Sequence, residues 1–233
     1  FFFKQKTAYE ISTRDWSSDV CSSDLPAVAP LREKLADPAT RVAAMEILGT
    51  IGGPAKGALP DMVKALADPD EAYRSDAAVA IASFGADAAD AVPELNTLVE
   101  STTAAPGTRY AAAYALGRIG PAARPALGKL RELAATDDEL LATVAVWAAL
   151  KIDPADSSLF ASAVPRLRKA LRSGDEIVRL EAAVALGDIG PDAKPALPLL
   201  ELVAEDDPLP SVREAAEQAI AKISVANATP ARP

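Results

Sequence analysis

Histidine is absent from the 233-residue chain, and cysteine occurs only once, as Cys21. Without histidine the chain has no imidazole general base, and without a cysteine pair it has neither a disulfide nor a zinc finger. Glycines 49, 52, 53 and 57 have no preceding strand pattern and no following Gly-Lys-Ser/Thr, so they do not form a phosphate loop. Carboxylates are spread over what we expect to be solvated faces. We therefore expect no catalytic residue, no cofactor and no metal site.

Aromatic residues are scarce, at 5% of the chain, and acidic residues outnumber basic ones by 33 to 24, which gives a net charge of −9. Nucleic acids and anionic membrane surfaces both bind through Lys and Arg, so this balance argues against either partner. No apolar run approaches the roughly 18 residues of a membrane span. The remaining composition is rich in Ala and Leu, which favours closely packed helices.

The opening segment, residues 1–25, differs in composition from the rest of the chain. It holds three of the five Phe, one of the two Trp and the only Cys. Translated back into codons, Lys4–Glu10 and Asp15–Leu25 match stretches of a common short-read sequencing adapter, and the segment is identified as a translated adapter. Its longest apolar run is Phe1–Phe3, which is too short for a secretory signal. We expect this segment to be non-native and irregular.

An adapter at this position implies that the natural beginning of the gene is missing. We therefore expect the chain to be a fragment of a longer bacterial protein. Any export signal would be lost with the missing part, so the sequence leaves the compartment open and favours the cytoplasm slightly.

One phrase recurs six times along the rest of the chain. The copies are RVAAMEILGTIG (41–52), RSDAAVAIASFG (74–85), RYAAAYALGRIG (109–120), LATVAVWAALKI (141–152), RLEAAVALGDIG (179–190) and REAAEQAIAKIS (213–224). Their leading residues are spaced by 33, 35, 32, 38 and 34 positions, a period typical of solenoids of helical hairpins. Apolar residues within each copy recur at helical spacing, as Ala183, Leu186 and Ile189 do.

A second helical pattern lies between the copies, with Pro early in each helix, where a missing N–H costs nothing. The Ile-Gly pairs at 51–52, 119–120 and 189–190 supply a residue for a left-handed helix C-cap. Two helices per period and no strand pattern predict an all-α, right-handed α-solenoid of six hairpins, the first of them truncated. The expected repeats are 26–53, 54–86, 87–121, 122–153, 154–191 and 192–224, followed by a disordered tail at 225–233.

These copies resemble the HEAT-like repeat of the phycobilin-lyase type, whose second helix reads roughly V-R-x-x-A-x-x-A-L-G-x-I-G. Val178-Arg179 through Ile189-Gly190 match this pattern best, whereas the fourth copy departs most, with Leu141 in place of Arg. The resemblance implies that the second helix of each hairpin lines the concave side. It also includes subunits of bilin lyases. The related deoxyhypusine hydroxylases hold di-iron through His-Glu pairs, which this chain cannot form.

Positions one, five and nine after each leading residue share a helix face. In the fourth copy this stripe holds Ala142, Val146 and Leu150, which leaves Trp147 one position off it and assigned to the core. The stripe is aromatic and apolar in the middle repeats, as in protein-binding hot spots. The candidate binding residues are Tyr110, Tyr114, Arg118, Val146, Leu180 and Val184. The alternative is that the two tyrosines pack between helices.

An inter-helix Asp and the Arg that opens the second helix recur together. The pairs are Asp37/Arg41, Asp68/Arg74, Asp175/Arg179 and Asp207/Arg213. We interpret them as a structural ladder in which Asp caps the second helix and pairs with an Arg of the same or the adjacent repeat. The alternative is a charged binding surface.

The sequence therefore predicts a monomeric interaction scaffold that holds a protein or peptide on its concave face, with a bilin-lyase subunit as the alternative. Binding to nucleic acid, as in HEAT-like DNA glycosylases, would need a basic concave face. The stripe instead mixes Arg118 and Lys222 with Glu46, Asp188 and Glu214.

Overall fold

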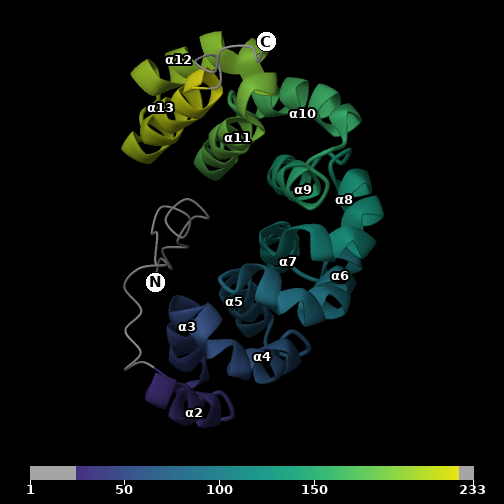
Figure 1. Cartoon of the computed structure of the whole chain (residues 1–233), viewed down its shortest axis with the longest axis vertical. Coiled ribbons are helices and arrows are strands. Elements are labelled where there is room, and N and C mark those ends of the chain that lie inside the picture. The colour runs from purple at the N-terminus through teal and green to yellow at the C-terminus, as the bar shows by residue number, and fades with distance from the viewer. Residues whose placement is uncertain (1–24, 226–233) are drawn as a thin grey trace, which may run out of the picture.

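The computed structural model describes residues 25–225, apart from the side chains of 25, 26, 157–161 and 225. Nearly all of the adapter-like segment and the predicted tail therefore lie outside the described residues. The described part is helical and contains no strand, which confirms the predicted all-α solenoid. Its helices follow one another in hairpins along a C-shaped arc (Figure 1).

Two layers of helices form this arc, one inside the curve and one outside (Figure 1). The inner layer consists of α3 (Arg41–Ile51), α5 (Glu71–Ala82), α7 (Pro106–Ile119), α9 (Glu139–Ile152), α11 (Glu176–Ile189) and α13 (Pro210–Val225). The outer layer consists of α2 (Leu25–Lys34), α4 (Leu59–Ala65), α6 (Val92–Glu100), α8 (Leu127–Leu133), α10 (Ser157–Ala170) and α12 (Leu197–Asp206). The second helix of each hairpin thus lines the concave side, as the resemblance implied.

Short 3-10 segments lead from most inner helices into the next outer helix. They are η3 (Gly53–Ala58), η4 (Gly85–Ala91), η5 (Gly120–Ala126) and η6 (Gly190–Ala196). The glycine that ends the inner helix has positive φ at Gly52, Gly120 and Gly190, with values of 65°, 73° and 69°. The positive φ explains why these positions hold glycine, which alone adopts it without steric cost. Their ψ values of −135°, −139° and −135° differ from those of the predicted left-handed α cap, so the glycines turn the chain into the 3-10 segment in another conformation.

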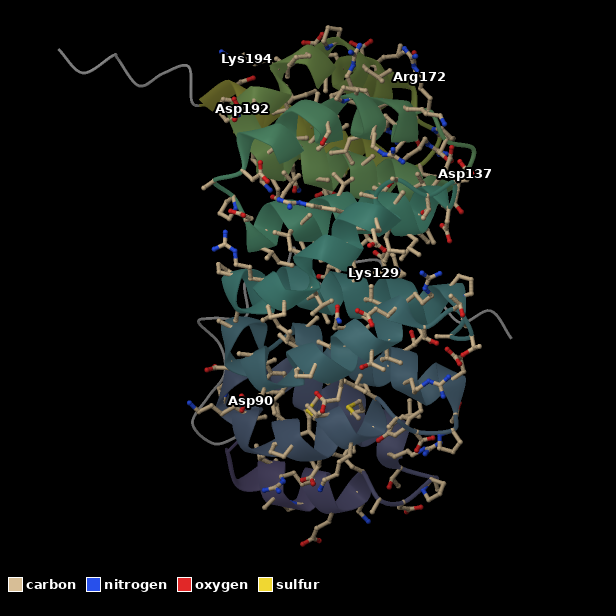
Figure 2. The ribbon with its side chains drawn as sticks, turned by 90° about the vertical axis from the view of Figure 1, so that its right-hand side faces the viewer. Asp90, Lys129, Asp137, Arg172, Asp192 and Lys194 are labelled. Atoms are coloured by element: carbon tan, nitrogen blue, oxygen red, sulfur yellow. The ribbon has the colours of Figure 1, made fainter. Side chains whose placement is uncertain are left out.

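The connections gather on two opposite edges of the solenoid, which Figure 2 shows from the convex side. Asp137 and Arg172, from turns within hairpins, lie on one edge, whereas Asp90, Asp192 and Lys194, from turns between hairpins, lie on the other. The outer helices form the face between the two edges. The core therefore runs as a continuous layer between the inner and outer helices.

Small residues bring neighbouring inner helices close together. A Cβ added at Gly49 would lie 2.9 Å from the Cβ of Ala80 on the next inner helix, and one added at Gly187 would lie 2.9 Å from the Cα of Ala219. Leu48, Leu116 and Leu186, at the equivalent position of three inner helices, are fully buried in the core. Each hairpin therefore buries its apolar stripe against its neighbours, as in other solenoids.

Candidate functional site

A groove of about 770 Å³ lies on the concave face of the second half of the arc. Helices α7, α9, α11 and α13 all contribute to its lining, and we call it the central groove. Its lining side chains include Tyr114, Arg118, Trp147, Lys151, Glu181, Val184, Asp188, Glu214, Gln218 and Lys222. Four consecutive repeats thus form one continuous surface.

Three aromatic rings form a stack at one wall of this groove. The ring of Tyr114 lies between the rings of Tyr110 and Trp147, with centroid distances of 6.5 and 5.2 Å and interplanar angles of 8° and 13°. Gly117 makes room for the indole ring of Trp147, because a Cβ at this position would lie 2.4 Å from a carbon of that ring. The lack of a side chain at Gly117 therefore sets the position of Trp147.

The sequence left open whether Tyr110 and Tyr114 line the concave face or pack between helices, and the structure shows both features. Tyr114 is buried, and its hydroxyl has no hydrogen-bond partner in the described part of the chain, although its residue borders the groove. Burial raises the pKa of Tyr114 to about 12, with the nearby Arg118 opposing the rise. The two tyrosines pack between helices and also form the wall of a groove.

Tyr110 joins two helices that are not adjacent in the repeat order. Its hydroxyl on α7 donates a 2.9 Å hydrogen bond to the carboxylate of Glu181 on α11, passing over α9. Burial raises the pKa of Tyr110 well above its usual value, and the negative charge of Glu181 raises it further. Thr143, on the intervening helix α9, is only 5% exposed and so is also shielded from solvent. We call this contact the Tyr110–Glu181 clasp.

The carboxylate of Asp188 contacts three side chains of the groove. It accepts a 3.0 Å hydrogen bond from Trp147 Nε1, a 2.9 Å contact from Lys151 Nζ and a 3.0 Å contact from Lys222 Nζ. Burial raises the pKa of Asp188, but the two lysines and the indole N–H outweigh this effect and leave the pKa below its usual value. Asp188 is therefore ionised at neutral pH and links α9, α11 and α13.

The structure brings some of the predicted binding residues together and separates others. Tyr114, Arg118 and Val184 line the central groove, and Tyr110 stacks behind Tyr114. Val146 is 7% exposed and borders a different depression, beside Arg131 and Arg166. Leu180 is 2% exposed and belongs to the core. The predicted stripe is therefore wrong at Val146 and Leu180.

A one-residue error in the alignment of the fourth copy explains the misplacement of Val146. In five copies the closing apolar residue, such as Ile119 or Ile189, follows the leading residue by ten positions. Counting back ten from Ile152 gives Ala142, not Leu141, as the leading residue. The stripe then holds Thr143, Trp147 and Lys151. Trp147 is therefore on the stripe, buried to 8% exposure and yet lining the groove.

Two residues of the groove are absent from the predicted binding residues: Lys151 because of this shift, and Glu181 because carboxylates were expected on solvated faces. Glu181 is in fact 5% exposed. Aligning the copies on their closing residue would have found Lys151. No comparable signal marks Glu181, because its burial and its contact with Tyr110 depend on helices that are far apart in the sequence.

The Asp/Arg ladder lies along the edge formed by the turns within hairpins. Arg179 contacts Asp207 of the next repeat at 2.7 Å and donates to the carbonyl of Ser173 at 2.9 Å. Arg41 contacts Asp68 of the next repeat at 2.7 Å and Asp70 at 3.0 Å. Arg41 and Arg179 therefore each tie their repeat to the one that follows.

Capping by the ladder aspartates is only part of their role. Asp175 accepts from the backbone N–H groups of Ile177 and Val178 and so caps α11. The other three ladder aspartates instead brace the turn, because each accepts from the backbone two residues further on. Arg74 and Arg213 donate to the backbone carbonyls of Asp68 and Asp207, both at 2.6 Å. The residues that cap α5 and α9 are Asp70 and Asp138.

Two kinds of site are not found among residues 25–225. No group of three or more Cys, Asp or Glu side chains in this range could hold a metal ion. No helix in the same range is long and apolar enough to cross a membrane.

Comparison with known proteins agrees with this fold. A family profile described as HEAT repeats matches residues 59–151 and 152–221. No curated protein matches the sequence. The chain is similar to the complex of CpcE and CpcF of phycocyanin lyase from Nostoc sp. PCC7120, with 22% identity, TM-score 0.65, and coverage of 89% of this chain and 77% of that chain.

Two engineered proteins are also similar. One is an engineered protein with 24% identity and TM-score 0.52, covering 85% of this chain and 97% of that chain. The other is a designed armadillo repeat protein in complex with the peptide (KR)4, with 22% identity and TM-score 0.52, covering 84% of this chain and 99% of that chain. At these identities the likeness concerns the fold alone.

Proposed function

The chain belongs to the HEAT-repeat family, and on that premise we propose that it is an interaction scaffold that binds a protein or peptide segment in the central groove. The observation that carries this proposal is the groove itself, formed by four consecutive inner helices. Its volume lies within the roughly 300–1,000 Å³ usual for binding sites. No catalytic arrangement accompanies it among the described residues.

The composition of the groove supports a protein partner. Trp147, Tyr114 and Arg118 meet within it, and Trp, Tyr and Arg are the residues most enriched in binding hot spots. Val184 adds a half-buried apolar surface, and charged side chains surround these residues. An apolar centre with a polar rim is the usual anatomy of a protein interface. A similar solenoid, the designed armadillo repeat protein, holds a peptide.

Selection from a displayed library of linear peptides would test this function. The full chain would be compared with Val184→Trp, which fills the groove, and with Lys129→Trp, which adds the same bulk to the outer face (Figure 2). We expect the enriched peptides to bind the parent and Lys129→Trp but not Val184→Trp. If no peptide is enriched, or if Val184→Trp retains all of them, the proposed binding site is wrong.

A bilin-lyase subunit remains the second candidate. The observation in its favour is the similarity of fold to the CpcE–CpcF complex. Incubating the chain with bilin and an apo-phycobiliprotein tests it. Formation of a fluorescent adduct would support the lyase role, and its absence would reject it.

A further inference from the structure

Basic side chains form a row along one rim of the central groove. Arg118, Lys151 and Lys222 occupy the ninth position after the leading residue of their copies, and Asp188 occupies the same position between them. All four line the groove. Because they sit near the C-terminal ends of α7, α9, α11 and α13, they lie side by side across four repeats.

The row carries more positive charge than its own carboxylate neutralises. Asp188 holds the ammonium groups of both Lys151 and Lys222, so one negative charge faces two positive ones. Within the described part of the chain no carboxylate lies at ion-pair distance from Arg118, which is exposed. The Lys151 ammonium also lies 5.9 Å from the centroid of the Trp147 ring. The rim is therefore a preorganised cationic surface beside an aromatic wall.

A long polyanion does not fit the rest of the molecule. The chain carries a net charge of −9, and Asp76 on α5 lies close enough to Glu46 and Asp70 for their charges to raise its pKa, after burial as the main cause. Glu181 and Glu214 line the same groove. A polymer charged along its whole length would also meet the carboxylates of α3 and α5, whereas a segment confined to the groove could follow the basic row at the C-terminal ends of the helices. Glu181 and Glu214 lie nearer the N-terminal ends of α11 and α13 than this row does.

The span of the row sets the length of such a segment. Packed helices lie about 8–10 Å apart, so three steps from α7 to α13 cover roughly 24–30 Å. An extended peptide advances about 3.3 Å per residue, so about eight residues span the groove. Alternate side chains of an extended peptide point to opposite sides, which lets one set face the basic rim while the other faces Trp147 and Val184.

We propose that the occupant of the central groove is an extended acidic peptide segment whose carboxylates bind Arg118, Lys151 and Lys222 while its apolar side chains pack beside Trp147 and Val184. This inference rests on the proposed function and specifies the partner of the same site. Asp188 positions the two lysines and competes with the incoming carboxylates for them.

Three synthetic peptides of equal length, alternating Glu–Leu, Gln–Leu and Lys–Leu, test the charge preference. Each would be titrated against the full chain with Trp16→Phe, which leaves Trp147 as the only tryptophan and its emission as a reporter in the groove. We expect Glu–Leu to bind at least about tenfold more tightly than Gln–Leu, with the advantage lost at high salt, and Lys–Leu to bind most weakly.

Single substitutions separate a binding role from a structural one. Lys151→Gln and Lys222→Gln should each weaken Glu–Leu binding about fivefold, whereas Lys129→Gln on the outer face should leave it unchanged. Asp188→Asn should strengthen binding, because the amide still accepts from the Trp147 indole but no longer neutralises the lysines. A purely structural Asp188 would give lower thermal stability without tighter binding.

The outcomes distinguish this inference from the function on which it rests. If Gln–Leu or Lys–Leu binds as tightly as Glu–Leu, or if library selection yields neutral or basic peptides that Val184→Trp loses, the acidic partner is wrong while the scaffold function stands. A single-stranded oligonucleotide that binds more tightly than Glu–Leu would also overturn the acidic partner. If neither the synthetic peptides nor the library gives a groove-dependent ligand, the scaffold function itself fails.

Discussion

The contact between α7 and α9 differs from the contact between α11 and α13, although the same backbone arrangement builds both. In each, a glycine of one inner helix faces an alanine of the next: Gly117 faces Ala148, and Gly187 faces Ala219. At α7/α9 the indole of Trp147 also lies across the glycine. The indole of Trp147 thus makes the contact between α7 and α9 part of the groove wall, in addition to its role in helix packing.

The two contacts also differ in how their repeats are tied together. The repeats of α11 and α13 are joined at the loop edge by Arg179 and Asp207. The fourth copy has Ala142 where the ladder has its arginine. Around α9 the Tyr110–Glu181 clasp on the concave side joins the third and fifth repeats instead. The repeats around α9 therefore gain a contact on the concave side that spans three inner helices, in addition to loop-edge contacts such as the 2.7 Å hydrogen bond between Ser173 and Glu139.

Replacing the two glycines should give the largest difference in stability between the two contacts. Gly117→Ala places a Cβ 2.4 Å from the Trp147 ring, whereas Gly187→Ala places one 2.9 Å from the Cα of Ala219. We expect a loss of about 3 kcal/mol for Gly117→Ala and about 1–2 kcal/mol for Gly187→Ala, because overpacking strains both helices. Urea unfolding followed by circular dichroism measures both.

Combining Gly117→Ala with Trp147→Ala provides the control for that prediction. The double variant keeps only the close approach to Ala148, so its destabilisation should fall short of the sum of the single effects by at least about 1 kcal/mol. Strict additivity would show that the indole does not cause the strain.

Removing the ladder arginines should have the next largest effect. Arg179→Ala leaves Asp207, whose side chain is 4% exposed, without its bidentate partner, whereas Arg41→Ala leaves Asp68 and Asp70, which are 20% and 49% exposed. We expect Arg179→Ala to cost about 2 kcal/mol and Arg41→Ala less than about 1 kcal/mol. Thermal melting of the two variants checks this order. An unchanged melting temperature for Arg179→Ala would refute the structural ladder.

The two tyrosines should respond differently to loss of their hydroxyls. Tyr110→Phe removes the donor to the buried Glu181 and should cost about 1–2 kcal/mol. Tyr114→Phe removes a buried hydroxyl that has no partner in the described part of the chain, and should be neutral or slightly stabilising. Equal losses in chemical denaturation would contradict the clasp.

The smallest expected effect is a loss of folding stability at alkaline pH that depends on the hydroxyl of Tyr114. The pKa of Tyr114 is about 12 in the folded chain and about 10 in an unfolded one. Between these values the unfolded state releases the proton while the folded state retains it, so the stability contributed by neutral Tyr114 is present below pH 10 and lost as pH rises towards 12. At pH 11 the parent should lose about 1 kcal/mol relative to Tyr114→Phe.

Comparing the two proteins at each pH removes the contribution of lysine titration, which both share. Denaturation curves from pH 9 to pH 12 provide the measurement. Parallel pH profiles for the parent and Tyr114→Phe would show that the hydroxyl is not shielded in the folded state.

The repeats were readable from the sequence because each copy encodes a local pattern. Gly120 and Gly190 follow the last residue of their helices, where φ is positive and only glycine is free of steric cost. Arg179 recurs with its aspartate because neighbouring turns meet at one edge. Tyr114, Arg118 and Val184 were placed correctly because helical spacing alone puts them on the concave face.

The sequence by itself thus determined the solenoid, its period and most of its inner stripe, since these depend on contacts within a repeat or between adjacent repeats. Only the tertiary structure shows the pairing of Tyr110 with Glu181, which are 71 positions apart. It also decided the convergence of Lys151 and Lys222 on Asp188. Such contacts depend on how far the arc bends, and that curvature is the sum of small packing differences at every inner helix, which no single repeat encodes.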